Sequence, residues 1–235
     1  MIPVDERWWR EYRSIDDVVV YEVDVSEDDR REALAAHILD EEEWERSQRF
    51  VFPGPRRRFA LCRSALRSIL CLRIGCSNDD LKLGATDQEK PYAIVRNEPI
   101  EFGFNVSHSG DYGLIAIGEA PALGVDVEFR RHHPNLDLLV STVLSPDEKA
   151  QIASVNDLGE KNNLFFDFWT VKEAVLKAVG VGMSGPEPSE IEVPREMREG
   201  SRSCITQFRQ ISARNWRLVN LGTSKFAAAL AYMVD

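Results

Sequence analysis

Glu173 and Lys177 are the two side chains whose types and spacing most directly suggest chemistry. With Trp169 they fall at i, i+4 and i+8 in the segment FFDFWTVKEAVLKAVGVGM. A helix turns once in about 3.6 residues, so these three side chains project from one helix face. A carboxylate and an ammonium one turn apart could hold a metal ion and a phosphate together, but the same spacing also describes an ordinary surface ion pair.

Asp126 and Glu128 form a second acidic pair, in the sequence LGVDVE. Alternate residues of a strand share a face, so both carboxylates point one way, and Val125 and Val127 point the other way. Carboxylates this close repel each other unless a cation lies between them, and Mg²⁺ prefers a few carboxylates together with water and phosphate oxygens. A half-buried edge strand with a polar outer face is the alternative interpretation.

Ser107, His108 and Ser109 stand at the end of a strand-like segment, FGFNVSHSG. A serine nucleophile with a histidine base is excluded, because neighbouring residues of an extended chain point to opposite faces and no GxSxG turn surrounds them. The segment better suits a strand end whose hydroxyls, imidazole and N–H groups meet an oxyanion, with the histidine as a charged phosphate donor. A structural histidine with satisfied hydrogen bonds is the other interpretation.

Basic residues are concentrated in one part of an acidic chain. The net charge of the 235 residues is −10, and an acidic run occupies residues 24–45. The following segment, 46–73, contains Arg46, Arg49, Arg56, Arg57, Arg58, Arg63, Arg67 and Arg73. Nucleic acids attract basic surfaces, so the overall charge argues against general nucleic-acid binding. The basic segment instead predicts a compact anionic ligand, unless its arginines form a solvated helix face.

Other ligand and compartment classes are excluded by what the sequence lacks. It has no P-loop and no GxGxxG, which excludes the common nucleotide sites. Its four cysteines and four histidines show no metal-ligand spacing, so free thiols in a reducing compartment are expected. The N-terminal MIPVDERWWREYR lacks the apolar run of a signal peptide, and no segment approaches the roughly 20 apolar residues that cross a bilayer. A cytoplasmic protein without membrane contact is therefore expected.

Helices and short strands are expected in both halves of the chain. Apolar periodicity, caps and breakers predict helices at 26–38, 40–50, 56–74, from Ser145 onward, and 164–179. Strands are expected at 18–25, 81–85, 92–95, 102–106, 112–117, 123–129, 191–193, 216–221 and 226–234. Pro53-Gly54-Pro55 is expected to break the chain, Gly75 to end the third helix, and Gly180 or Gly182 to end the last.

The distribution of these elements predicts an α+β fold. A composition dip at residues 119–122 suggests a linker, which divides the chain into an N-terminal half, 1–119, and a C-terminal half, 120–235. Each half has helices and several short strands, so two units of similar size that meet face to face are expected.

Three motifs in order then connect this chain to a known family. FNVSHSG at 104–110, GVDVE at 124–128 and FWTVKEAVLKAVG at 168–180 resemble the motifs of the 4′-phosphopantetheinyl transferases of the surfactin-synthetase (Sfp) type. Lys90-Pro91 and the arginine-rich helix add to the resemblance, which covers nearly the whole chain in layout. The sequence WTVKEA is similar to that of the family branch that has Trp and Lys-Glu-Ala in this motif.

The resemblance implies both a fold and a reaction. The fold would be a pseudo-dimer of two α+β halves with coenzyme A bound between them, expected as a monomer. The enzyme would be a holo-carrier-protein synthase: it moves 4′-phosphopantetheine from coenzyme A to a serine of an acyl- or peptidyl-carrier protein and releases adenosine 3′,5′-bisphosphate. Such carriers serve fatty-acid, polyketide or nonribosomal-peptide synthesis. They are typically acidic around the serine, so docking onto this acidic chain would need a local basic or apolar patch.

The resemblance also implies roles for individual residues. Mg²⁺ would be held by Asp126, Glu128 and Glu173. Lys177 would meet the phosphates, and Glu173, or a water that Glu173 and the metal hold, would act as the base. Coenzyme A would contact the remaining site residues, Arg46, Arg58, Lys90, Pro91, Ser107 and His108. Among these, Arg58 matches the 3′-phosphate contact, and Lys90 and Pro91 follow the adenine side.

Two positions depart from the family pattern. Glu89 stands where Gly commonly precedes Lys-Pro, and Glu43 stands where a further basic phosphate contact is expected.

Two other functions fit the same residues: a coenzyme-A-binding module without catalysis, and a different Mg²⁺-dependent phosphoryl-transfer enzyme. Trp169 is expected to support packing rather than to touch substrate.

Overall fold

The computed structural model describes residues 2–86, 90–120, 122–180 and 185–234. Its helices are η1 Val4–Glu6, α1 Asp29–Ala36, α2 Glu41–Gln48, α3 Pro53–Ile74, α4 Leu136–Val143, α5 Pro146–Ser154, α6 Leu158–Val179, η3 Pro188–Glu190 and α7 Arg195–Arg198. The strands before residue 120 are β1 Trp9–Ile15, β2 Val18–Asp24, β3 Leu81–Ala85, β4 Pro91–Val95, β5 Glu98–Pro99, β6 Gly103–Ser109 and β7 Tyr112–Gly118. The later strands are β8 Leu123–Phe129, β9 Ser203–Gln207, β10 Asn215–Asn220 and β11 Phe226–Val234.

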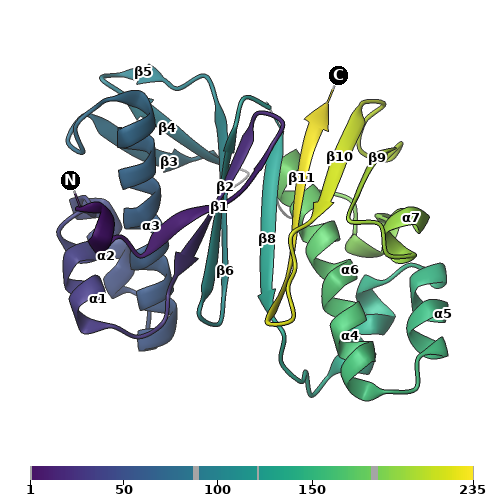
Figure 1. Ribbon diagram of the computed structural model, residues 1–235. Helices are drawn as coiled ribbons and strands as arrows, with labels where there is room; N and C mark the ends of the chain where they lie inside the picture. Colours follow the sequence, from purple (N-terminus) through teal and green to yellow (C-terminus); the bar gives the residue numbers. More distant parts are fainter. Residues whose placement is uncertain (1, 87–89, 121, 181–184, 235) are drawn as a thin grey trace.

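The described strands form two four-stranded antiparallel sheets and one small sheet. The first sheet has the order β1-β2-β7-β6, the second β8-β11-β10-β9, and the small one β3-β4-β5. The expected mixture of helices and strands is therefore confirmed. In Figure 1 the first sheet lies on the left with α1, α2 and α3, and the second on the right with α4, α5 and α6.

Two long helices anchor the two sheets. α3 and α6 both contain 22 residues, and each ends at a glycine in the left-handed conformation, Gly75 at φ 75° and Gly180 at φ 70°. A glycine adopts that conformation without steric cost, so both predicted helix ends are confirmed. Gly182, the other predicted end of the last helix, lies outside the described residues.

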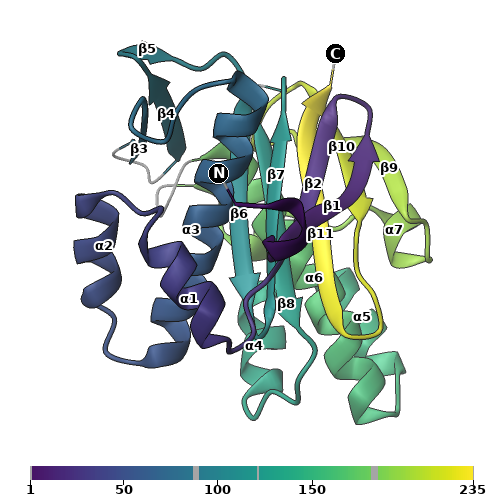
Figure 2. The same cartoon turned by 60° about the vertical axis from the view of Figure 1, so that its left-hand side comes forward.

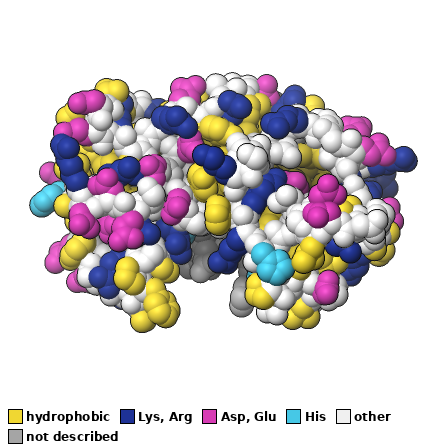
Figure 3. Space-filling model, turned by 60° about the horizontal axis from the view of Figure 1, so that its bottom comes forward, with side chains coloured by type: hydrophobic (Ala, Val, Ile, Leu, Met, Phe, Trp, Pro, Cys, Tyr) yellow, Lys and Arg dark blue, Asp and Glu magenta, His cyan; other side chains and the backbone are white. Residues whose placement is uncertain are grey.

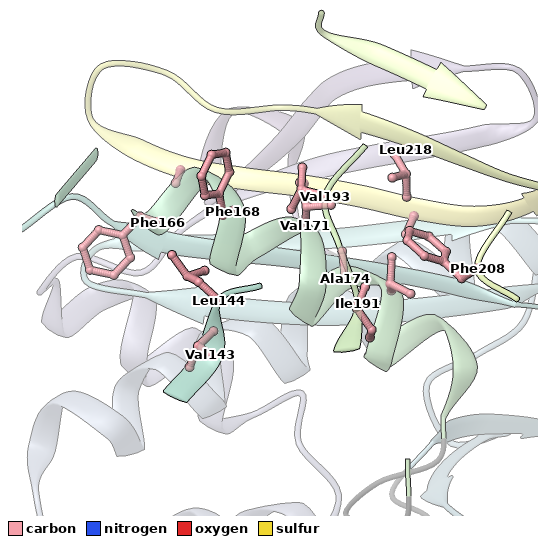
Figure 4. Packing of buried hydrophobic residues seen from close by; sticks show 14 of the residues in the cluster. Val143, Leu144, Phe166, Phe168, Val171, Ala174, Ile191, Val193, Phe208 and Leu218 are labelled. Carbon is pink, nitrogen blue, oxygen red and sulfur yellow. The ribbon is translucent and has the colours of Figure 1, made fainter. Parts of the chain in front are cut away.

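α6 packs on the second sheet through a large aromatic and aliphatic cluster. Figure 4 shows Phe168, Val171 and Ala174 of α6 beside Val193 and Leu218. Gly124 of β8 permits this close approach, because a Cβ there would overlap the carbonyl oxygen of Ala174 and lie 2.5 Å from the backbone nitrogen of Ala178. β8 and α6, which carry both acidic motifs, are therefore held against each other by packing.

The two four-stranded sheets are joined by a third buried cluster. Val18, Val20 and Leu114 from the first sheet pack with Val125 and Leu230 from the second. Side-chain hydrogen bonds connect β6 to β8. Asn105 Oδ1 accepts from the Val125 N–H at 3.0 Å, and Ser107 Oγ accepts from the Val127 N–H at 3.3 Å. β6 and β8 therefore lie side by side, as Figure 2 also shows, without a backbone ladder between them.

Several predicted elements differ from the structure. The predicted strand at 191–193 is wrong: that segment is irregular, and the edge strand is β9 instead. Pro53-Gly54-Pro55 does not break the chain but forms the first turn of α3, where a proline needs no N–H partner. β1 and α4 were not predicted, because the charges of β1 hide its alternation and α4 follows a histidine–proline loop.

Among the described helices, none combines the length and the apolar character required for a bilayer crossing.

Candidate active site

A cavity of about 640 Å³ opens where α3, β4, β6 and α6 approach one another. Its wall includes six of the predicted site residues, namely Arg46, Lys90, Pro91, His108, Glu173 and Lys177. Figure 3 shows Lys and Arg side chains along the hollow between the two lobes. The structure thus brings together residues from four separate motifs of the sequence.

Asp126 is buried outside the cavity wall, where Ser107 and the wall residue Lys177 contact it. Lys177 Nζ is 2.6 Å from Asp126 Oδ1 and 3.0 Å from Ser107 Oγ, and Ser107 Oγ donates to the same Asp126 oxygen at 2.8 Å. The other oxygen, Asp126 Oδ2, is buried without a hydrogen-bond partner among the described residues. A buried carboxylate oxygen without a partner is costly, so a cation or a donor supplied by a ligand would stabilise this atom.

Glu128 lies two residues after Asp126 on β8 and has a similar contact. Its Oε2 accepts from Ser109 Oγ at 2.6 Å, just as Asp126 accepts from Ser107. Both carboxylates therefore face β6 from the same side of β8, as the period of two predicted. Burial raises the pKa of Glu128, the hydrogen bond from Ser109 lowers it, and the negative charge of Asp126 raises it further.

Glu173 faces the same region from α6. Burial raises the pKa of this carboxyl, and the negative charges of Asp126 and Glu128 raise it further, against the opposing effect of Lys177. The three carboxylates thus repel one another electrostatically. Among the residues that the structure describes, however, no group of three or more His, Cys, Asp or Glu is arranged to hold a metal. The Lys177 ammonium is the cation that balances Asp126 here.

His108 and Ser107 point to different environments, as expected for neighbours on a strand. Ser107 is buried and bonds to Asp126 and Lys177, whereas His108 reaches the cavity. The surrounding protein lowers the pKa of His108 by desolvation, and the positive charges of Arg58 and Lys177 lower it further. Arg58 itself is not part of the cavity wall, although its charge reaches His108.

Lys90 and Pro91 line the cavity beside the C-terminal end of α6. Burial lowers the pKa of Lys90, and its Nζ lies 3.5 Å from the carbonyl oxygen of Ala178 near the end of α6. The small sheet therefore meets the C-terminal end of α6 at the cavity edge. Glu89, the first departure from the family pattern, lies outside the described residues.

Arg63 is a cavity residue that was not assigned to the site from the sequence. Its guanidinium lies 5.7 Å from the centre of the Phe59 ring, and that of Arg46 lies 5.2 Å from the same centre. Two cations thus share one aromatic ring in the cavity wall, an arrangement that favours an anion between or beside them. The signal in the sequence was the i, i+4 spacing of Phe59 and Arg63 in α3.

Glu43 has a structural role that explains the second departure. It is buried, closes the capping box of α2 with Asp40, and accepts from Arg67 Nη1 at 3.1 Å. Its other oxygen lies 3.7 Å from Arg63 Nε. Burial raises the pKa of Glu43, while Arg67 and Arg63 lower it. This carboxylate lies behind the cavity wall rather than in the cavity, where it orients Arg63.

Trp169 supports packing, as expected, but also does more. Its ring stacks on Phe165 with centres 6.3 Å apart and planes 15° apart, beside the core cluster of the second sheet. The indole also contributes a small lowering of the pKa of Glu128, one of the predicted metal ligands.

Comparisons with known proteins agree with these motifs. The family described as "4'-phosphopantetheinyl transferase superfamily" matches residues 122–231, and "4'-phosphopantetheinyl transferase, N-terminal" matches residues 27–119. The 4'-phosphopantetheinyl transferase HetI of Nostoc sp. is 33% identical over 176 residues, which cover 75% of this chain and 74% of HetI. The putative 4'-phosphopantetheinyl transferase slr0495 of Synechocystis sp. is 37% identical over 149 residues, 63% of this chain and 59% of that protein.

More distant relatives carry similar names. A phosphopantetheinyl transferase of Thraustochytrium sp. is 31% identical over 155 residues, 62% of this chain and 54% of that protein. The chain thus spans less than two thirds of the length of the Synechocystis and Thraustochytrium relatives.

Proposed function

This chain belongs to the 4′-phosphopantetheinyl transferase superfamily, and on that premise we propose that it transfers the 4′-phosphopantetheine arm of coenzyme A to a serine of an apo acyl- or peptidyl-carrier protein. The serine oxygen forms a bond to the phosphorus that carries the arm. The bond from that phosphorus to the oxygen bridging the two phosphates breaks, and adenosine 3′,5′-bisphosphate leaves. The serine proton passes to a base.

The single observation that carries this proposal is the meeting of three motifs at Asp126. Lys177 comes from the WTVKEA helix, Ser107 from FNVSHSG and Asp126 from GVDVE. Lys177 Nζ lies 3.0 Å from Ser107 Oγ, and both atoms contact the same oxygen of Asp126. The cavity beside them is lined by arginine, lysine and histidine. Such a site combines a place for a cation with a place for phosphates.

The charges of the cavity suit the phosphates of coenzyme A. Arg46 and Arg63 present guanidinium forks, which bind phosphate oxygens bidentately, near Phe59. Lys90 and His108 are the further donors of the wall. Arg58 is proposed for the 3′-phosphate on the resemblance alone, and Arg63 is the stronger candidate because it lines the cavity.

Asp126, Glu128 and Glu173 have the donor chemistry that Mg²⁺ requires. The unpartnered Oδ2 of Asp126 and the mutual repulsion of the three carboxylates support a cation there. When bound, Mg²⁺ would neutralise the pyrophosphate and stabilise the leaving anion. Glu173, with its raised pKa, is the candidate to accept the serine proton directly or through a water. Lys177 then stabilises the developing charge on the phosphates.

We also propose the finer assignments of fold and branch. The paired 22-residue helices α3 and α6, each with its own four-stranded sheet, support a pseudo-dimer with the boundary at 119/120 and the active site between the halves. The WTVKEA wording supports the Trp and Lys-Glu-Ala branch of the Sfp type.

Mass spectrometry of a panel of apo-carrier proteins tests the activity. Each carrier is incubated with the protein, coenzyme A and Mg²⁺, and the expected result is a mass gain of one phosphopantetheine arm on at least one carrier. Cleavage of coenzyme A without any carrier would indicate a different phosphoryl-transfer enzyme. Tight coenzyme A binding without cleavage or transfer would indicate a binding module.

Asp126→Ala tests the proposed active site around Asp126. We expect transfer to fall by at least about 100-fold, because the variant removes the acceptor of Lys177 and the proposed metal ligand together. Circular dichroism should show that the fold survives. Asp137→Ala, on α4 and outside the cavity wall, is the control and should leave turnover unchanged. Near wild-type turnover in Asp126→Ala would rule out the site.

A further inference from the structure

Two large apolar side chains stand exposed in the loop between α2 and α3. Val51 is 84% exposed and Phe52 is 70% exposed. They are flanked by Arg49, whose side chain is 77% exposed, and by Arg56, which is also exposed. These four residues, Arg49, Val51, Phe52 and Arg56, are called the loop patch below.

The loop patch is held in place rather than loosely attached. The Phe50 N–H donates to the carbonyl oxygen of Ser47, and Arg56 Nη2 donates to the carbonyl oxygen of Phe50 at 3.1 Å. Pro53 and Pro55 in the first turn of α3 fix the backbone that follows. A fixed loop that exposes neighbouring apolar side chains marks a contact surface, because the fold itself gains nothing from their exposure.

The loop patch adjoins the mouth of the cavity. The Phe50 ring packs on Phe59 with centres 5.5 Å apart, and Phe59 belongs to the cavity wall with Arg46 stacked over it. Val51 and Phe52 follow Phe50 directly in the chain. A molecule seated on the loop patch would therefore lie next to the cavity that the proposed function assigns to coenzyme A.

The segment that contains the loop patch is basic in an acidic chain, although Arg49 Nη2 lies 4.0 Å from Glu45 Oε2 of α2. Residues 46–58 contain five arginines and no Asp or Glu, in a chain with a net charge of −10. An arginine-flanked apolar surface complements a partner face that is both acidic and apolar. The acidic remainder of the surface would repel such a partner elsewhere and so guide it to this loop.

From these observations we propose that the loop patch is the docking surface for the acidic, apolar face of the carrier protein that presents its acceptor serine to the cavity. This inference rests on the proposed function. It names the carrier as occupant because the surface combines opposite charge with a position beside the reacting centre. Side chains at docking surfaces contribute mainly to affinity, so their removal should affect recognition of the carrier and not recognition of coenzyme A.

The test compares the double variant Val51→Ser/Phe52→Ser with the wild type in steady-state transfer to an apo acyl carrier protein. We expect the KM for the carrier to rise about tenfold or more, with the KM for coenzyme A and the kcat at saturating carrier within twofold of the wild type. Ile205→Ser is the matched control, since Ile205 is 53% exposed on the edge strand β9, and it should leave all three constants unchanged. These positions are exposed, so thermal unfolding should shift little.

Charge reversal gives a second and independent measurement. Arg49→Glu should raise the carrier KM and weaken its dependence on ionic strength, because an attractive charge becomes a repulsive one. A carrier in which acidic residues beside the acceptor serine are changed to lysine should recover part of the loss with Arg49→Glu and react poorly with the wild type.

Distinct results would overturn the inference. A carrier KM within twofold of the wild type in both variants would exclude this surface. An equal rise in the KM for coenzyme A would assign the loop to the coenzyme A site. A wild-type dimer that dissociates in the double variant, seen by light scattering, would assign the loop patch to a second copy of the chain. If the wild type transfers to no carrier in the panel, the proposed function itself fails, and the docking surface with it.

Discussion

His108 illustrates how the structure changes the chemistry of a residue. The sequence predicts a charged phosphate donor, yet desolvation and the nearby Arg58 and Lys177 lower the pKa of the free imidazole. The free imidazole therefore binds its proton less tightly than an ordinary histidine. A bound phosphate favours the charged form, so anion binding should be accompanied by proton uptake at this residue.

Proton uptake on coenzyme A binding is the corresponding prediction. Because the pKa of His108 starts below its ordinary value and an anion raises it, affinity should increase as pH falls from 8 to 6, by up to about tenfold per pH unit. Isothermal titration calorimetry in two buffers of different ionisation enthalpy measures the uptake directly. His108→Asn should abolish this part of it.

A control is needed for the ligand's own titration. The 3′-phosphate has a second pKa of about 6, so it gains charge as pH rises and opposes the effect of His108. Dephospho-coenzyme A lacks that group and isolates the protein's contribution. Equal proton uptake by wild type and His108→Asn with this ligand would contradict the role of the imidazole.

Ser107 and Glu43 show that a position in a motif does not define what a side chain touches. Ser107 was predicted to meet phosphate, but it is buried between Asp126, Lys177 and the Val127 N–H. Glu43 departs from the family pattern without placing a negative charge in the cavity, because it pairs with the buried Arg67 behind the wall. Both contacts involve residues at least 19 positions away, which the local sequence cannot reveal.

At the scale of elements, α6 is positioned by a fully buried ion pair. Lys172 Nζ lies 2.7 Å from Glu148 Oε2 and also donates to the carbonyl oxygens of Pro188 and Ile191. Glu148 in turn accepts from the Val193 N–H at 2.7 Å. The lysine of WTVKEA thus connects α6 with α5, with η3 and with the irregular segment that follows η3, and it directly precedes Glu173 in sequence.

Lys172→Met should destabilise the protein by about 3–5 kcal/mol, because it leaves the buried Glu148 without its counter-charge. Urea unfolding followed by circular dichroism measures the loss. The double variant Lys172→Met/Glu148→Leu removes both charges and should recover a large part of that stability. A single variant as stable as the wild type would show that the pair contributes nothing to the position of α6.

The element predictions succeeded where local signals were strong. The strands at 81–85, 123–129 and 226–234 coincide with β3, β8 and β11, because alternation or a continuous apolar run marks each one. The predicted strand at 191–193 was wrong. The carbonyl of Ile191 and the N–H of Val193 bond to the Lys172–Glu148 pair rather than to a neighbouring strand. Only the tertiary structure supplies that competing partner.

At the scale of the whole molecule, the two sheets share one buried interface. Leu230 of β11 pairs with Val125 of β8 and packs in the cluster that contains Val18, Val20 and Leu114 of the first sheet. Tyr232 Oη donates to Asp16 at 2.6 Å across the same interface. The cavity is lined by residues from both halves, so the halves have to fold together to form it.

Leu230→Ala tests this coupling. We expect a loss of about 2–5 kcal/mol, and a single calorimetric transition that moves to lower temperature without splitting, because a cavity in the shared cluster weakens both halves. Scanning calorimetry of wild type and variant measures both features. Two separate transitions, only one of them shifted, would show that the halves unfold independently.

The sequence alone determined the family, the α+β class and the residue types of the site, since periodicity and short motifs are local properties. The tertiary structure decided which of those residues meet. It placed Asp126, Lys177 and Ser107 in contact, put Arg63 rather than Arg58 in the cavity wall, and exposed Val51 and Phe52 beside the cavity. These outcomes depend on packing between segments far apart in the chain, where burial and the competition for hydrogen-bond partners act on the folded molecule as a whole.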